Sequence, residues 1–149
     1  SFSTRRGLPA GFSWRMPVNV RFGAGCSDGL GEALGQRSAL VMAFEPATRL
    51  GLEAQWRAEL GDLLVDWVTV PEGLSSLDNA RTLAARVWPA LAASPGCVLV
   101  AVGGGSTLDL AKVLCCRPAD GGFDGVAMAL RGNAPWPELL RAPLRSLSL

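Results

Sequence analysis

The chain of 149 residues contains no histidine. Imidazole is the commonest metal ligand in proteins, so its absence argues against a zinc site. The cysteines do not replace it, because none of them stands in a Cys-x-x-Cys pair. We expect four reduced and mostly buried thiols, as in cytosolic proteins. They are Cys26, Cys97, Cys115 and Cys116.

Long apolar runs and charge clusters are also missing. No run approaches the roughly 20 apolar residues that cross a bilayer, and residues 1–15 lack the continuous apolar segment of a signal peptide. The 14 basic and 13 acidic residues nearly balance, with no long basic run to bind nucleic acid. We therefore expect a cytoplasmic protein that contacts neither membrane nor nucleic acid.

The chain is rich in apolar residues, which make up 49% of it. Its length favours a single domain over residues 1–149, with a poorly defined segment at 1–13 and an irregular part at 117–149. Such an apolar chain either builds a generous core or has a face that another molecule covers.

Strands are predicted from two kinds of apolar pattern. Val18, Val20 and Phe22 alternate with polar residues, which predicts a strand over 17–22 with one buried face. The run at 39–44 is apolar throughout, as in strands that are buried on both faces. Further strands are predicted at 63–70, 97–102 and 143–149.

Helical spacing of apolar residues separates these strands. Helices are predicted over 26–34, 48–60, 75–93, 106–116 and 123–130. Ser75 and Asp78 have the spacing of a capping box, whereas Pro89 is expected to kink or shorten its helix. Alternating strands and helices predict an α/β fold, a Rossmann-like parallel sheet with helices on both faces.

The most informative segment is the turn Gly103-Gly104-Gly105, between the strand at 97–102 and the next helix. Three residues without a Cβ let a polyanion approach the backbone, with the free N–H groups and positive dipole end of the helix directed at it. We predict a diphosphate site. In the alternative, the turn is structural, with Ser106 as N-cap and Asp109 completing a capping box. That alternative does not require three consecutive glycines.

Lys112 lies one helical turn beyond Asp109 and has two possible roles. It reaches a phosphate or the second half of a cofactor, or it forms a surface ion pair with Asp109. The sequence leaves both possibilities open.

The motif Gly-Gly-Gly-Ser-x-x-Asp-x-Ala-Lys at 103–112 resembles the signature of the iron-dependent (group III) alcohol dehydrogenases. Relatives of that family include dehydroquinate synthases and glycerol-1-phosphate dehydrogenases. Weaker matches follow in the right order, so the resemblance covers roughly residues 12–116, and its details lean toward the phosphonoacetaldehyde-reductase-like branch. They are Phe12-x-Trp14-x-x-Pro17, Val20-x-Phe22-Gly23-x-Gly25, Ala39-Leu-Val-Met-Ala, Thr48-Arg49-x-Gly51-Leu52 and Pro71.

The resemblance implies a nicotinamide cofactor. In the family the glycine-serine turn, here the three glycines and Ser106, binds the diphosphate of NAD or NADP, and the motif's aspartate, here Asp109, lies beside the cofactor. Many members carry an acidic residue after the second strand that selects NAD by bonding the ribose hydroxyls. Phe44 stands at that place with Glu45 next to it, so the resemblance allows either cofactor.

The resemblance also implies a metal that this chain does not supply. The family binds Fe²⁺ or Zn²⁺ through one aspartate and three histidines in a helical second domain, whose place would follow Leu149. We therefore expect an NAD(P)-binding domain of an alcohol or aldehyde oxidoreductase that is truncated, or completed by a partner chain, and not catalytically complete alone. The alternative is a non-enzymatic nucleotide-binding or oligomerisation module. Family members often pair through their N-terminal strands, which makes Val18–Phe22 the predicted edge of a homodimer.

Overall fold

The computed structural model describes residues 34–45, 51–71 and 77–147. The predicted strand at 17–22, with its dimer edge, lies outside the described residues, as do Cys26, Ser75 and nearly all of the helix predicted at 26–34. The main sheet contains four strands, each at a predicted position. They are β1 (Ala39–Phe44), β2 (Leu64–Val70), β3 (Val98–Val102) and β6 (Leu144–Leu147).

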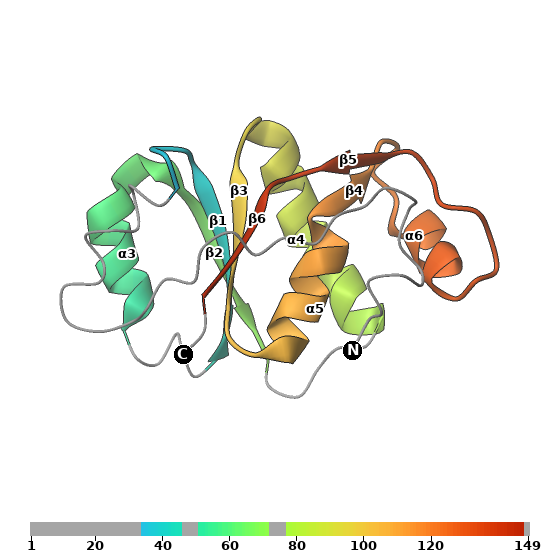
Figure 1. The fold of residues 1–149 in the computed structure, drawn as a ribbon, viewed down its shortest axis with the longest axis horizontal. Helices are drawn as coiled ribbons and strands as arrows, with labels where there is room; N and C mark the ends of the chain where they lie inside the picture. The colour runs from blue at the N-terminus through green and yellow to red at the C-terminus, as the bar shows by residue number, and fades with distance from the viewer. Residues whose placement is uncertain (1–33, 46–50, 72–76, 148–149) are drawn as a thin grey trace.

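The four strands are all parallel and lie in the order β2-β1-β3-β6 (Figure 1). The chain passes from β1 outward to β2 and then returns beyond β1 to form β3. The strand order therefore reverses between β1 and β3. Open α/β sheets bind their ligands at such a reversal, in the crevice outside the carboxyl ends of the strands. The predicted α/β class is confirmed, and it gives a definite place to look for a site.

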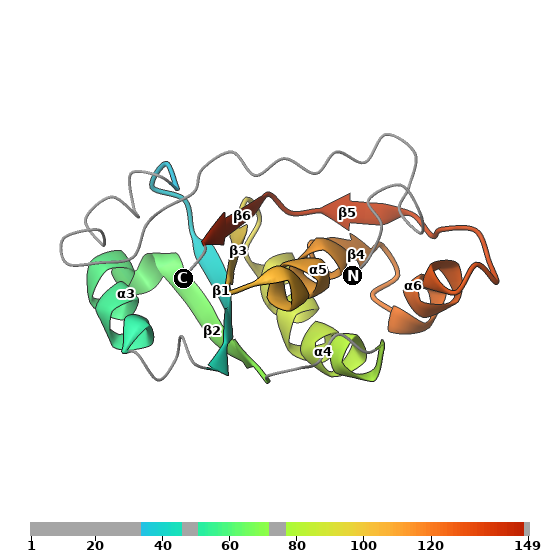
Figure 2. The same ribbon diagram turned by 60° about the horizontal axis from the view of Figure 1, so that its bottom comes forward.

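Helices cover both faces of the sheet (Figures 1 and 2). One face carries α3 (Leu52–Leu60), which the short 3₁₀ helix η2 (Gly61–Leu63) follows. The other carries α4 (Leu77–Ala93) and α5 (Gly105–Leu114). Because side chains alternate along a strand, Leu40 and Met42 pack into the core on the α4 and α5 side, and Val41 into the core beneath α3.

Aromatic side chains fasten the helices to the sheet and to one another. On the α3 face, the Trp56 and Trp67 rings meet edge to face with centroids 5.5 Å apart. On the other face, Trp88 Nε1 donates a hydrogen bond of 2.9 Å to the Leu114 carbonyl, which joins α4 to the end of α5. A buried indole N–H thereby finds the acceptor that it needs.

Two helices differ locally from the predictions. Pro89 does not shorten its helix, because α4 continues through it to Ala93, the predicted end. Pro89 is exposed, so water can bond the carbonyl one turn earlier that loses its N–H partner. The next helix was expected over 106–116, but α5 begins at Gly105 and ends at Leu114. Its N-cap is Gly104 and not Ser106.

The part beyond α5 is more regular than expected. Cys116 was placed in a helix, but it opens β4 (Cys116–Pro118), which pairs antiparallel with β5 (Leu139–Arg141). Next to this pairing, the Ala142 N–H donates to the Cys115 carbonyl at 2.7 Å, which draws the backbone out of the helix. The helix predicted at 123–130 is present as α6 (Phe123–Leu130). Across the described ranges, no helix is both long and apolar enough to cross a membrane.

Candidate functional site

The carboxyl ends of β1, β2 and β3 meet at one edge of the sheet, where a cavity of about 230 Å³ opens. Four of its lining residues are among the predicted site residues: Phe44, Gly104, Gly105 and Ser106. Val70, Pro71 and Thr107 complete the wall. These three were missed as site residues. The one signal for Val70 and Pro71 is that ligands bind at the carboxyl ends of parallel strands, and it does not say which strand ends meet.

The first glycine of the turn is required by the protein's own packing. Gly103 has φ +148°, a conformation that side chains rarely allow. A Cβ on Gly103 would lie 2.9 Å from Thr107 Oγ1 and 3.1 Å from Phe44 Cδ1. The Phe44 ring and the buried Thr107 therefore close over the backbone at this point. Gly103 lets β3 turn sharply into α5 and does not line the cavity, and its contact with a diphosphate stays a prediction.

The other two glycines have no such internal reason. A Cβ on Gly104 or Gly105 would meet nothing within 4 Å, and neither residue has a positive φ. Glycine is entropically unfavourable in a folded chain, at about 0.5–1 kcal/mol relative to alanine within a helix. Both residues line the cavity, so their missing side chains leave room there that the protein does not itself fill.

The backbone around these two glycines presents donors to the cavity. The first intrahelical bond of α5 runs from the Leu108 N–H to the Gly104 carbonyl at 3.1 Å. Among the hydrogen bonds between described residues, none uses the N–H of Gly105, Ser106 or Thr107. All three residues line the cavity. Free N–H groups at the positive end of a helix form a site for an anion, and a phosphate is the usual occupant.

The remaining predicted residues lie near the cavity but do not line it. Glu45 directly follows β1 and is half-buried. Asp109 is buried on α5 and Lys112 is half-buried one turn later. All three make polar contacts with other groups of the protein. Their roles toward a cofactor remain predictions, and so do the two alternatives for Lys112.

A second and larger cavity of about 490 Å³ lies between α4 and residues 117–121, away from the glycine turn. None of the predicted site residues lines it. At its rim Arg81 forms an ion pair of 2.7 Å with Asp124 and lies 5.0 Å from the centre of the Phe123 ring. The charge of Arg81 is therefore already compensated within the protein.

The cysteines of the described part are buried thiols, as predicted. The Sγ atoms of Cys115 and Cys116 are 3.8 Å apart, and Cys115 also lies 3.3 Å from the Lys112 carbonyl. The hydrogen bond with Cys116, together with burial, raises the pKa of the Cys115 thiol well above its usual range. Burial likewise raises the pKa of Cys97. Neutral buried thiols of this kind are poor nucleophiles.

Known proteins resemble this chain in structure rather than in sequence. No protein-family model matches it, and no curated protein is similar enough to be matched. Among solved structures, it is similar to an NADH-dependent butanol dehydrogenase from Thermotoga maritima, with a TM-score of 0.56 and 21% sequence identity. The match covers 91% of this chain and 33% of the dehydrogenase, so the chain spans about a third of that protein's length. At this identity the likeness establishes the shared fold.

Proposed function

We propose that the cavity at the carboxyl ends of β1 and β3 binds the diphosphate of NAD(H) or NADP(H). The chain would then be the nucleotide-binding domain of an oxidoreductase that acts on alcohols or aldehydes. One observation carries the proposal. Gly104 and Gly105 leave bare backbone facing the cavity without any internal need for glycine. The N–H groups of Gly105, Ser106 and Thr107, which donate to none of the other described residues, would supply the donors that a diphosphate requires.

The size and lining of the cavity define which part of the cofactor it takes. About 230 Å³ is below the roughly 300–1,000 Å³ of a pocket for a whole drug-sized ligand. We therefore assign it to the diphosphate and the adjoining ribose, with the rest of the dinucleotide lying outside. Phe44, and not a carboxylate, forms the wall at the end of β1. The described lining of the cavity holds no carboxylate that would repel an added phosphate, and Glu45 lies outside that lining. We therefore expect both NADH and NADPH to bind.

The metal that the resemblance implies does not fit the residues present. The sequence has no histidine, and the described ranges hold no group of three or more histidine, cysteine, aspartate or glutamate side chains that could bind a metal. No catalytic step follows from these residues. What they provide is a rigid backbone cradle at the end of a sheet, which binds the cofactor and fixes its orientation. The name of the structurally similar dehydrogenase, which specifies NADH, supports this assignment.

Isothermal titration of the chain with NADH and with NADPH tests the proposal, and two matched variants sharpen it. Gly105→Ala adds a methyl group to the empty space of the cavity. Gly125→Ala adds one within α6, where the new Cβ would lie at an ordinary distance of 3.6 Å from Pro137. Because both glycines are helical, each change is expected to raise the free energy of unfolding slightly, by up to about 1 kcal/mol.

The two variants should differ only in ligand binding. Gly105→Ala should weaken NADH binding about tenfold or more, which corresponds to about 1.4 kcal/mol. Gly125→Ala should bind as the unmodified chain does. Equal affinities in the two variants would remove the turn from the binding site. A titration without heat for either nucleotide, confirmed by an unchanged unfolding temperature, would refute the proposed function altogether.

A further inference from the structure

Among the strands of residues 34–45, 51–71 and 77–147, β2 lies at the edge of the main sheet and pairs with β1. An edge strand exposes a row of backbone N–H and C=O groups that can pair with a strand of another molecule. The sequence of β2, Leu-Val-Asp-Trp-Val-Thr-Val, favours such pairing because it is mostly β-branched or aromatic. Asp66 is its single charged residue.

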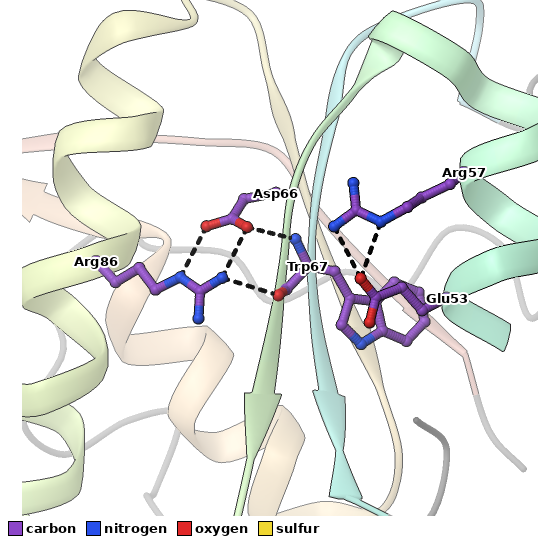
Figure 3. Close-up of polar contacts among 5 residues, drawn as sticks. All are labelled: Glu53, Arg57, Asp66, Trp67 and Arg86. Carbon is purple, nitrogen blue, oxygen red and sulfur yellow. Dashed lines mark hydrogen bonds and ion pairs between the residues drawn. The ribbon is translucent and has the colours of Figure 1, made fainter. Parts of the chain in front are cut away.

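Side chains occupy the exposed backbone groups at the centre of this edge (Figure 3). The Trp67 N–H donates to Asp66 Oδ1 at 2.8 Å, and Arg86 Nη2 of α4 donates to the Trp67 carbonyl at 3.1 Å. The same guanidinium donates two hydrogen bonds to the Asp66 carboxylate, from Nη2 to Oδ1 at 2.8 Å and from Nε to Oδ2 at 2.9 Å. Both backbone groups of Trp67 that face away from β1 are thus satisfied within the chain.

The pairing of β2 with β1, on the opposite side of the strand, also contains an irregularity. Ala39 of β1 pairs with Leu64, and the next residue, Leu40, pairs with Asp66. Val65 is therefore an extra residue in β2, as in a β-bulge. Bulges twist an edge strand away from the flat geometry that strand addition needs. The bulge and the Asp66–Arg86 pair stand next to each other in the strand.

We infer that Asp66 and Arg86 close the free edge of β2 against pairing with the β2 edge of a second copy of this chain. Two identical edges pair antiparallel about a twofold axis, so that each strand bonds the backbone N–H and C=O groups of the other. Trp67 is the middle residue of the seven in β2, and an antiparallel pair centred on the strand would place the two Trp67 residues at that axis. Asp66 and Arg86 bond the Trp67 N–H and C=O, the groups that would pair at the centre of such a dimer.

The exposure of the pair favours this role over a stabilising one. The Arg86 side chain is 55% exposed and that of Asp66 25% exposed. Ion pairs at such exposure contribute roughly 0–1 kcal/mol to stability. The pair therefore adds little to the free energy of unfolding, whereas two unsatisfied backbone groups at an apolar edge would be a direct route to association.

Figure 3 also contains the matched control for an experiment. Arg57 forms an ion pair of 2.8 Å with Glu53 within α3, and its side chain is 50% exposed, close to the value for Arg86. Arg57→Ala and Arg86→Ala each remove one half-exposed arginine from one ion pair, but only the second frees the edge. Light scattering at rising protein concentration gives the mass of each variant relative to the unmodified chain.

We expect Arg86→Ala to double its mass relative to the unmodified chain as concentration rises, and Arg57→Ala to match the unmodified chain throughout. A folded Arg86→Ala with unchanged mass at every concentration overturns the inference. Hydrogen exchange of the unmodified chain provides a test that does not depend on a variant folding. The Trp67 amide should be protected at least about tenfold against exchange relative to an unstructured peptide. Exchange of that amide at the rate of an unstructured peptide would also overturn the inference. NADH affinity should be the same in both variants, so the result is independent of the proposed function.

Discussion

The aromatic ring of Phe44 lies where a side chain on Gly103 would have to be. The two residues come from the ends of β1 and β3, and their contact brings these strand ends together behind the proposed phosphate site. The contact explains why the three glycines of the turn are not equivalent. One is needed for packing, while the other two face open space.

Gly103→Ala should therefore destabilise the protein. The new Cβ would clash with Thr107 Oγ1 and the Phe44 ring, and φ of +148° is strained for alanine. We expect a loss of roughly 1–3 kcal/mol in the free energy of unfolding by urea denaturation. Gly104→Ala is the control, since its Cβ would meet nothing within 4 Å and its φ is −95°. Equal stability of the two variants would contradict the distinction between the glycines.

Asp66 should contribute to the fall in the free energy of unfolding at acid pH. The hydrogen bond from Arg86 holds the pKa of the Asp66 carboxyl below its usual 3.8. A carboxyl that is more acidic when folded stabilises the protein above its unfolded pKa, and this stabilisation is lost as the pH falls through the folded pKa. Because the pair is partly exposed, the contribution is about 1 kcal/mol or less.

Urea denaturation of the unmodified chain and of Asp66→Asn over a range of pH measures this contribution. The difference in unfolding free energy should be constant above about pH 5 and shrink below the unfolded pKa. A difference that does not change from neutral pH to the acid limit would show that Asp66 is not held in its ionised form by Arg86.

The buried cysteines should not react in the folded protein. In a Cys26→Ser variant, the thiols left are Cys97, Cys115 and Cys116, all of them buried. A raised pKa for Cys97 and Cys115 leaves little thiolate at mild alkaline pH. We expect a disulfide reagent such as dithionitrobenzoate to label none of them in buffer and all three in urea. Rapid labelling of one thiol in buffer would show that its site opens locally.

The strands of the main sheet were predictable because burial on both faces demands continuous apolar runs, as in β1 and β3. The pair β4 and β5 was not, because three-residue strands are too short for a period to appear. Helix α4 survives Pro89 because its buried residues, among them Val87, Trp88 and Leu91, supply packing that outweighs one lost hydrogen bond.

At the candidate site, the glycine motif predicted the position of the cavity and part of its lining, but not Val70 and Pro71. Val70 ends β2 and Pro71 follows it, and the place of β2 in the sheet is set by tertiary pairing, which local sequence does not specify. Likewise, the motif gave no means of separating Gly103 from Gly104, because they differ in backbone conformation and in the approach of Phe44 and Thr107, which only the structure shows.

The parallel sheet has a consequence for how the cradle comes into existence. No two of its strands can join through a short hairpin, since every pairing must wait for a crossover segment to fold back. The pairing of β1 with β3 closes over both α3 and α4, so the glycine turn contacts Phe44 only after these long-range contacts form. A nucleotide that binds this turn would then bind only when the whole sheet is folded. Saturating nucleotide would therefore stabilise the folded protein against unfolding.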